Sequence, residues 1–406
     1  MSHKLRIGMV GGGPGAFIGG VHRICLAMDG QFELVAGAFS SDPAKSLKTG
    51  AELGLDPKRI YGDWKGMLEA EAKLPVDQRI AALSIVTPNA LHFGPAKLAL
   101  GRGFHVICDK PLAITVEEAE ELEKLVAHSK LQFCVTHNYT GYPMVREARN
   151  LVQSGQLGEI RKVYVEYLQG WLSDKLEETG QKQASWRVDP KISGPCGAMG
   201  DIGTHAANLT EHITGSRIES MLAVLKTWVE GRALDDDGMV LFKLKNGATG
   251  TLAASQVCVG KENALAIRIF GTKGGLSWQQ EHPNDLHVYW KERAQELRRP
   301  GNGWVHDEAK TLQRIPAGHP EGYLEGFANI YRNFTNHIRA IEAGTKPNPL
   351  DMDYPSIEEG VAGMAFIEAV VASSAKNAAW TPLDYKPTTR AKYGDASLDS
   401  DRGGLS

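Results

Sequence analysis

The stretch 9-MVGGGPGAFIGGVHR-23 packs six glycines into fifteen residues and directly follows a short apolar run, Leu5 to Val10. So many glycines indicate a backbone that turns sharply or lies very close to something else. A nucleotide, a phosphate group and a plain turn are all consistent with the run alone. A strand, then Gly11 and Gly13 around one residue, then a helix is typical of dinucleotide-binding folds, where the pyrophosphate lies at the helix N-terminus.

The segments that follow the glycine run favour the nucleotide. Apolar runs of strand length recur after it, and segments of helix length separate them; the runs lie at residues 32–39, 81–86, 104–108 and 131–138. Strands and helices that alternate at this spacing predict a parallel sheet covered by helices on both faces. We therefore expect an α/β fold whose first domain, residues 1–137, is a Rossmann dinucleotide-binding domain.

The second part of the chain has a different pattern. Strand-like segments follow one another with few helices between them, at residues 160–169, 220–231, 238–259, 264–280 and 285–293. This pattern predicts an α+β domain over residues 138–385 with a large, open, mainly antiparallel sheet. A free sheet face needs a cover, so we expect a homodimer or homotetramer formed through this sheet. Residues 386–406 are polar and form a predicted C-terminal tail.

Composition narrows the choice of partners. The chain has 406 residues, 45 Lys and Arg against 48 Asp and Glu, and a formal net charge of -3. This balance gives no bulk attraction to nucleic acid or to a membrane surface, which leaves a small-molecule substrate. No secretory signal is visible and no apolar run approaches the roughly 18 residues that span a bilayer, so we expect a cytoplasmic protein. The five scattered cysteines predict reduced thiols, and no metal is expected.

The end of the second strand bears on the choice of dinucleotide. An acidic residue is expected there to bind the ribose hydroxyls, and this chain has Ser40, Ser41 and Asp42. No arginine lies nearby to meet a 2'-phosphate, and the nearest base is Lys45. The sequence therefore favours NAD, with NADP not excluded.

Two short motifs follow later strands, 87-TPNALH-92 and 108-CDKP-111. The carboxyl ends of parallel strands are where open α/β sheets bind ligands. Lys110 is either a surface charge paired with Asp109 or a functional ammonium group, and its position favours function. The predicted cofactor-binding residues are Gly11, Gly13, Pro14, Gly15, Ala16, Ser40, Ser41, Asp42, Thr87, Pro88, Asn89, His92, Asp109 and Lys110.

The motif 197-GAMGDIGTHAANL-209 supplies a carboxylate and an imidazole. Asp201 and His205 are four positions apart, so on a helix they share one face. A carboxylate beside an imidazole raises its basicity, and histidine titrates near neutrality, as a general base for an alcohol requires. The alternative is an aspartate at a helix start near an ordinary histidine.

Taken together, the glycine loop, T-P-N-x-x-H, D-K-P-L and G-D-x-G-x-H resemble the glucose-fructose oxidoreductase / inositol dehydrogenase / rhizopine catabolism (Gfo/Idh/MocA) family over about residues 4–380. That family commonly has E-K-P where this chain has D-K-P, and a shorter glycine loop. The resemblance implies a catalytic set of Lys110, Asp201 and His205. In it, His205 takes the proton of a secondary hydroxyl while a hydride passes to the nicotinamide, Lys110 stabilises the alkoxide, and Asp201 orients the substrate or His205.

The resemblance implies a sugar, sugar derivative or cyclitol as substrate. An alternative within the family is an NAD-dependent glycoside hydrolase that oxidises the sugar transiently, eliminates, hydrates and reduces again, with Tyr139 as an added acid or base. A non-catalytic nucleotide sensor is disfavoured because it needs no such set of three. Trp186 and Arg187 suit a polyhydroxy or anionic substrate, or else form core and a structural ion pair. The predicted substrate-binding residues are His137, Asn138, Tyr139, Trp186, Arg187, Asp201, His205 and His319.

Overall fold

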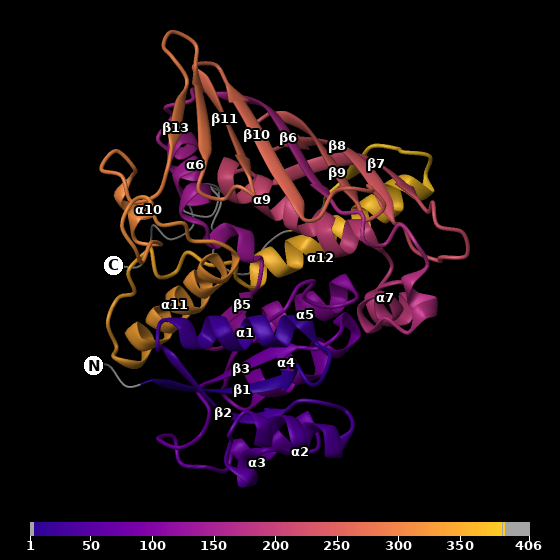
Figure 1. Ribbon diagram of the computed structural model, residues 1–406, viewed down its shortest axis with the longest axis vertical. Coiled ribbons are helices and arrows are strands. Elements are labelled where there is room, and N and C mark those ends of the chain that lie inside the picture. Colours follow the sequence, from indigo (N-terminus) through magenta and orange to yellow (C-terminus); the bar gives the residue numbers. More distant parts are fainter. Residues whose placement is uncertain (1–3, 384, 386–406) are drawn as a thin grey trace, which may run out of the picture.

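Two sheets lie one above the other with helices between them (Figure 1). The computed structural model describes residues 4–383 and 385, so the predicted polar tail lies outside the described residues. None of the described helices combines the length and the apolar composition needed to cross a membrane.

The lower sheet is parallel, with strand order β2-β1-β3-β4-β5, as the alternating pattern predicts. Its strands are β1 (Leu5–Gly11), β2 (Phe32–Ala38), β3 (Ala82–Val86), β4 (His105–Cys108) and β5 (Phe133–Val135). The helices that alternate with them are α1 (Phe17–Met28), α2 (Pro43–Glu52), α3 (Trp64–Glu71), α4 (Phe93–Gly101) and α5 (Val116–Ala127). Successive side chains of a strand enter different cores, because Ala82 belongs to one buried cluster and Leu83 to the other.

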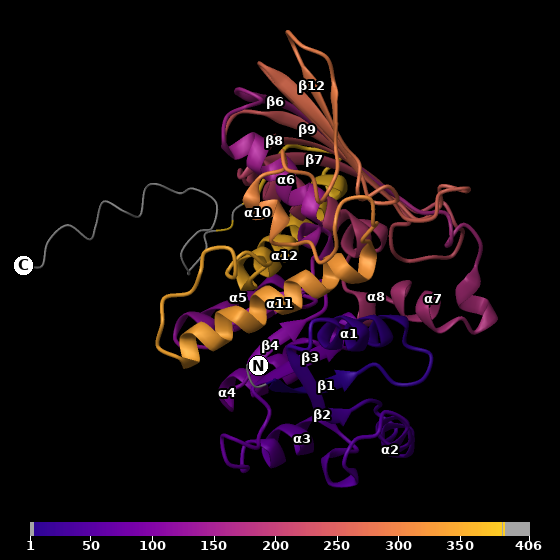
Figure 2. The same ribbon diagram turned by 60° about the vertical axis from the view of Figure 1, so that its left-hand side comes forward.

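One face of this first sheet is completed by the far end of the chain. Helix α11 (Tyr323–Glu342) lies beside α1 in both views (Figures 1 and 2), and its Phe327 and Phe334 pack in the same cluster as Ile7. The buried ring Nδ1 of His22 in α1 lies 2.6 Å from the hydroxyl of Tyr331 in α11. The division at residue 137 therefore stays a prediction, because a helix from the second half covers the first sheet.

The upper sheet has nine strands in the order β13-β12-β11-β10-β6-β9-β8-β7-β14. They are β6 (Ile160–Leu168), β7 (Ile218–Lys226), β8 (Asp237–Leu244), β9 (Thr249–Ser255), β10 (Ala264–Gly271), β11 (Gly274–Gln279), β12 (Leu286–Trp290), β13 (Glu296–Arg298) and β14 (Thr381–Pro382). All neighbours pair antiparallel except β6 and β9, which run parallel. The predicted fold class, a Rossmann domain followed by an open, mainly antiparallel sheet, is confirmed.

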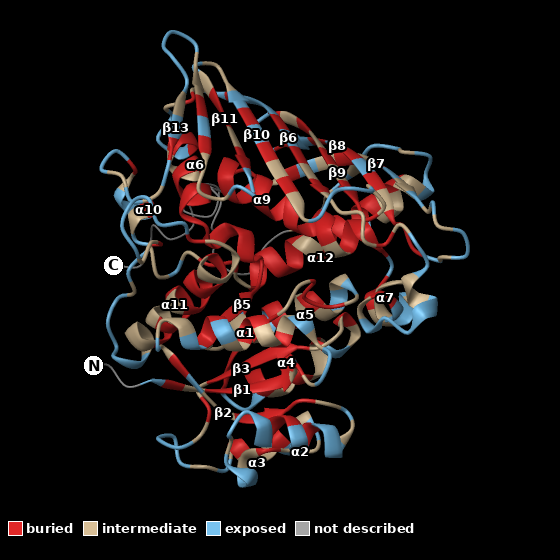
Figure 3. Ribbon diagram, in the orientation of Figure 1, coloured by how far each residue is buried: buried red, intermediate tan, exposed pale blue. Residues whose placement is uncertain are grey.

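The described helices that pack on this second sheet lie on its inner face, towards the first sheet (Figure 3). The remaining helices are α6 (Pro143–Gln153), α7 (Lys182–Arg187), α8 (Pro190–Ser193), α9 (Thr204–Thr214), α10 (Asp307–Lys310) and α12 (Ile357–Ala375). Strand β8 alternates buried and exposed residues, as a strand with one solvent face does. The outer face exposes Val224, Met239 and Leu241, whose exposed fractions are 54%, 61% and 46%.

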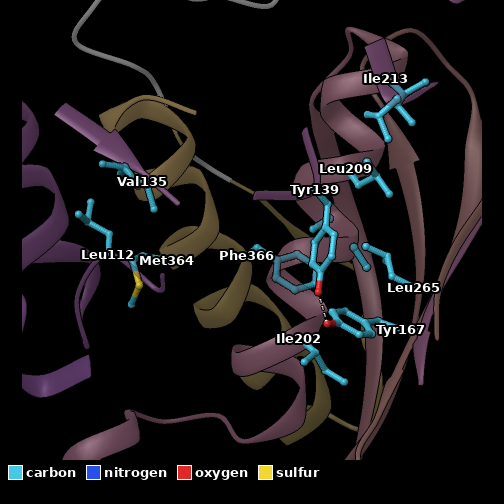
Figure 4. Close-up of a cluster of buried hydrophobic side chains, with 14 of the residues drawn as sticks. Leu112, Val135, Tyr139, Tyr167, Ile202, Leu209, Ile213, Leu265, Met364 and Phe366 are labelled. Atoms are coloured by element: carbon cyan, nitrogen blue, oxygen red, sulfur yellow. Dashed lines mark hydrogen bonds between the residues drawn. The ribbon is translucent and has the colours of Figure 1, made fainter. Parts of the chain in front are cut away.

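The two halves share one continuous buried core. Figure 4 shows Leu112 and Val135 from the first half, Met364 and Phe366 on α12, and Leu209 on α9. These residues belong to a single cluster of buried hydrophobic side chains. The surfaces that meet between the halves are therefore held by packing, which fixes the walls of the site described next.

Candidate active site

A cavity of about 870 Å³ lies between the two halves of the chain. The glycine loop and the ends of the parallel strands line one side. Residues that precede and begin α9, together with the ends of β6 and β10, line the other side. This is the edge at which the sequence analysis places a ligand.

Close packing explains the glycine loop. A Cβ on Gly13 would lie 2.6 Å from the carbonyl oxygen of Phe39, and a Cβ on Gly19 would lie 2.3 Å from the Cα of Gly12. Gly19 therefore fulfils the role of the third glycine in the dinucleotide motif, which is to permit close packing of helix and strand. Neither Gly19 nor Gly12, which also lines the cavity, is among the predicted cofactor-binding residues. The signal for Gly19 was the second glycine pair in the run.

The N-terminus of α1 is suited to an anion. Its first turn contains no acidic residue, and α1 begins at Phe17 directly after the glycine loop. Free backbone N–H groups at such a terminus bind phosphate oxygens. Pro14 and Ala16 line the cavity beside it, whereas Gly15 does not. Gly15 has φ +75°, and its role is to let the loop turn.

The residues at the end of β2 line the cavity, but the carboxylate of Asp42 is already engaged in a hydrogen bond within the protein. Its carboxylate accepts a hydrogen bond of 3.0 Å from the N–H of Ala44 and so caps α2. The hydroxyl of Ser40 accepts one of 3.1 Å from the N–H of Asp42. Ser41 also lines the cavity. The side chains at this end are neutral or acidic except for Lys45, which pairs with Asp42.

The T-P-N-A-L-H motif divides into lining and supporting residues. Thr87, Pro88 and Asn89 line the cavity. His92 does not: it is buried, and its two ring nitrogens lie 2.8 Å from the carbonyl oxygens of Thr87 and Pro111. Burial lowers the pKa of His92. This corrects the expectation that His92 contacts the cofactor, because the ring braces the two strand-end loops from behind.

Lys110 and Asp201 meet across the cavity. The ammonium Nζ of Lys110 lies 2.7 Å from Oδ1 of Asp201 and 2.5 Å from its carbonyl oxygen. Arg187 Nε and Gln256 Nε2 bind the other carboxylate oxygen at 3.0 and 2.9 Å. The simpler alternative, a surface pair of Lys110 with Asp109, is wrong. Burial favours the neutral acid, but the charges of Arg187 and Lys110 outweigh it and hold the pKa of Asp201 well below its usual range.

The backbone around Asp201 is not ordinary α-helix. Residues Met199–Gly203 form a π-helical turn that runs into α9. The carboxylate of Asp235 accepts hydrogen bonds of 2.6 and 2.9 Å from the N–H groups of Gly197 and Met199 and fixes the start of this turn. The expectation that Asp201 and His205 share one face of a regular helix is therefore corrected. The wider turn places the carboxylate of Asp201 against Lys110 and Arg187. The ring of His205 instead packs against aromatic rings.

His205 lines the cavity with an uncharged ring. Its centroid lies 4.8 Å from that of Tyr139 and 5.2 Å from that of His137, both in edge contacts. Burial lowers the pKa of His205 well below 6.5, and the charge of Lys110 lowers it further, against a smaller opposite effect of Asp201. The expectation that Asp201 raises the basicity of this imidazole is thus outweighed. Among the described residues, Nδ1 of His205 has no hydrogen-bond partner.

Hydroxyl and amide groups, some buried and some half-buried, surround the same end of the cavity. The hydroxyls of Tyr139 and Tyr167 lie 2.5 Å apart (Figure 4). Tyr167 donates to Oδ1 of Asn263 at 2.6 Å, and Nδ2 of Asn263 donates to Tyr139 at 3.2 Å. Single polar residues in strands and loops give no motif, so several lining residues of this kind were not predicted, among them Tyr167, Gln169, Asn263 and Gln280.

The other predicted substrate residues are placed as follows. Asn138, Trp186 and Arg187 line the cavity, and the guanidinium of Arg187 lies 4.3 Å from the ring centroid of Trp186. Of the two alternatives for Arg187, its ion pair with Asp201 is present. His137 is buried and is not among the lining residues, and His319 is exposed and away from the cavity. The expectation that His137 and His319 contact the substrate is therefore corrected, because neither residue lines the cavity.

A Rossmann domain with a glycine loop, facing a cavity that holds a lysine, a largely buried aspartate and an uncharged histidine, is typical of an NAD-binding oxidoreductase. Residues 5–137 match the model of the oxidoreductase family with an NAD-binding Rossmann fold, and residues 145–277 match the GFO/IDH/MocA C-terminal domain. The chain belongs to the GFO/IDH/MocA family, which confirms the resemblance stated above.

Relatives agree over nearly the whole chain. An oxidoreductase structure from Sinorhizobium meliloti is 45% identical, with 93% of this chain and 99% of that chain covered and a TM-score of 0.85. A structure of an inositol dehydrogenase homolog from Azotobacter vinelandii, complexed with NADH and myo-inositol, is 35% identical over 94% of this chain and 98% of that one, with a TM-score of 0.85. Levoglucosan dehydrogenase from Pseudarthrobacter phenanthrenivorans is 28% identical over 92% of this chain and 97% of its own length.

Proposed function

We propose that this protein oxidises a secondary hydroxyl of a neutral sugar, sugar derivative or cyclitol, with NAD as the hydride acceptor. The observation that carries the proposal is the contact of 2.7 Å between Lys110 and Asp201, with the uncharged His205 on the wall of the same cavity. Two similar proteins support the substrate class, since one is a levoglucosan dehydrogenase and the other is a homolog of inositol dehydrogenase complexed with myo-inositol.

The charges of the cavity favour a neutral polyol over a sugar acid or sugar phosphate. Both cations at the catalytic end, Lys110 and Arg187, already share the carboxylate of Asp201. What remains for substrate hydroxyls is a set of amides and phenols, from Asn138, Tyr139, Tyr167, Gln169, Asn263 and Gln280. Such groups donate to and accept from hydroxyls without any charge to balance.

The chain's own residues perform the proton chemistry of the proposal. Because His205 is uncharged at neutral pH, it is in the form that accepts the proton of the substrate hydroxyl. The ammonium of Lys110 donates a hydrogen bond to the same oxygen and stabilises the alkoxide as it develops. Asp201 is a positioning residue that holds Lys110 and Arg187 in place. NAD, when bound, supplies the acceptor for the hydride.

The glycosidase remains a second candidate because Tyr139 is buried beside His205. Burial raises the pKa of Tyr139, so its phenol keeps its proton and can act as an acid. Such an enzyme releases the aglycone of an aryl glycoside without net change in NADH.

A panel of neutral sugars, sugar acids, sugar phosphates and inositols, followed by absorbance of NADH, tests the proposal. We expect NADH to accumulate with at least one neutral polyol and not with its acid or phosphate derivative. Turnover of an aryl glycoside at constant NADH establishes the glycosidase instead. Fluorescence titration with NADH and NADPH checks the cofactor, with NADH expected to bind more tightly.

We also propose a homodimer or homotetramer formed through the outer face of the nine-stranded sheet. Val224 and Met239 are directly paired neighbours on β7 and β8, and both are more than half exposed. An apolar patch on an open sheet is a common interface. Light scattering is expected to give a multiple of the 44.1 kDa chain mass, and Met239→Lys with Leu241→Glu is expected to give monomers.

A further inference from the structure

Four cationic side chains line the cavity, and three of them form ion pairs with carboxylates. Lys45 pairs with Asp42, while Lys110 and Arg187 both pair with Asp201. Lys182 forms no ion pair within the part of the chain that the structure describes. Its ammonium Nζ instead donates a hydrogen bond of 3.2 Å to the carbonyl oxygen of Pro14, in the glycine loop.

This contact brings the second half of the chain over the glycine loop. Lys182 is the first residue of α7, and its Cδ lies 3.9 Å from the position that a Cβ on Gly15 would take. The glycine loop itself offers no cation to the cavity. Arg23 in α1 donates to the carbonyl oxygen of Gly12 at 2.9 Å and is not among the lining residues.

The segment that carries Lys182 is fixed on both sides of the cavity. We call residues 182–193, which contain α7 and α8, the arm. At its far end the carbonyl oxygen of Ser193 accepts a hydrogen bond of 2.8 Å from Nδ2 of Asn89, in the loop after β3. Between the two ends, Arg187 pairs with Asp201. The arm therefore holds Lys182 at the glycine loop by contacts that do not need a ligand.

A dinucleotide brings two negative charges to this place. The pyrophosphate lies at the N-terminus of the helix after the glycine loop, where backbone N–H groups give partial positive charge. A full positive charge beside it forms charge-assisted hydrogen bonds that are stronger than neutral ones. The only cation on the cavity wall that forms no ion pair, among the described residues, is therefore at the position where the cofactor's charge is expected to be greatest.

We propose that Lys182 binds the pyrophosphate of NAD, so that the second half of the chain supplies the cation of the cofactor site. The proposal rests on the NAD site and not on the identity of the substrate. It also gives the glycine loop's added length a role, because Pro14 and Gly15 form the part of the loop that meets Lys182.

The test is a fluorescence titration with NADH in the absence of substrate, on the full chain. Lys182→Met removes the charge, and Lys182→Arg keeps it. Lys191→Met is the matched control, since Lys191 is an exposed lysine on the same arm that does not line the cavity. We expect Lys182→Met to weaken NADH binding about tenfold, as loss of one charge-assisted hydrogen bond does. Lys182→Arg should bind within about threefold of the wild type, and Lys191→Met unchanged.

Two further measurements separate phosphate binding from bracing of the loop. ADP-ribose, which contains the pyrophosphate, should lose affinity in Lys182→Met, whereas adenosine should not. The loss for NADH should also shrink at high salt, because salt screens an exposed charge. Unchanged NADH affinity in Lys182→Met, or equal losses for ADP-ribose and adenosine, overturns the proposal. Because no substrate is present, a failed search for the substrate leaves this result intact.

Discussion

The ammonium of Lys110 and the carboxylate of Asp201 lie 2.7 Å apart although 91 positions separate them in the chain. Lys110 follows the fourth strand of the parallel sheet, and Asp201 lies in the turn before α9 under the second sheet. The contact therefore joins the two halves at the cavity. Because both groups are largely buried, their charges interact more strongly than exposed charges do.

Lys110→Met should lower kcat for polyol oxidation about 10²- to 10³-fold, as loss of one donor to a developing oxyanion does. Affinity for NADH should fall far less than kcat, because the phosphates of the cofactor are expected at the glycine loop and not at Lys110. Steady-state kinetics together with NADH titration check this. A kcat within threefold of the wild type would remove Lys110 from the chemistry.

Asp201→Asn should destabilise the fold by about 3 kcal/mol, because it leaves two largely buried cations without their counter-charge. The amide is nearly the same size as the carboxylate, so the effect is electrostatic rather than steric. Urea unfolding measures it. The double variant Asp201→Asn with Arg187→Met removes one of the stranded cations, and it should recover part of the loss.

We expect that the rate of polyol oxidation does not fall near pH 6.5 because of protonation of His205. Burial and the charge of Lys110 lower its pKa, so the uncharged form persists as the pH falls below 6.5. The profile of kcat/KM against pH measures this. A fall with an apparent pKa of 6.5 that disappears in His205→Asn contradicts the assignment. His205→Asn itself should lower kcat about 10²- to 10⁴-fold, as loss of a general base does.

Stability should fall as the pH is lowered from about 6.5 towards 4. Burial lowers the pKa of His22 and of His105 to about 4, so below pH 6.5 the unfolded chain takes up protons that the folded chain refuses. As the pH falls through that window, each such histidine lowers the free energy of unfolding by about 1.4 kcal/mol per pH unit. Urea unfolding at several pH values should show that the free energy of unfolding depends less steeply on pH in His22→Gln than in the wild type. An equal dependence would contradict the lowered pKa of His22.

Gly19→Ala and Gly20→Ala form a matched pair within α1. A Cβ on Gly19 would meet the Cα of Gly12 at 2.3 Å, whereas a Cβ on Gly20 meets nothing within 4 Å. We expect Gly19→Ala to lower Tm and weaken NADH binding, because the helix must move away from the glycine loop. Gly20→Ala should raise stability by roughly 0.5–1 kcal/mol, as Ala for Gly in a helix does. Equal effects of the two would contradict the close approach.

The first half of the molecule could be read from the sequence because its signals are local. Strand and helix periods, the glycine run, and the polar residues after β3 and β4 each depend on neighbours in the chain. The open second sheet followed from the spacing of its strands for the same reason. The role of Gly19 was not predicted, because a spacing rule does not show which glycine of a longer loop packs against another segment.

The sequence by itself determined the fold class and favoured NAD as cofactor, and it predicted the three residues proposed for catalysis, since each is marked by a motif that can be recognised locally. Only the tertiary structure decided the charge state and the contacts of the site residues. It put Asp201 between two cations, left His205 uncharged, moved His92 behind the loops and brought Lys182 over Pro14. The physical reason is that burial and charge pairing depend on segments distant in the chain, and no local pattern carries that information.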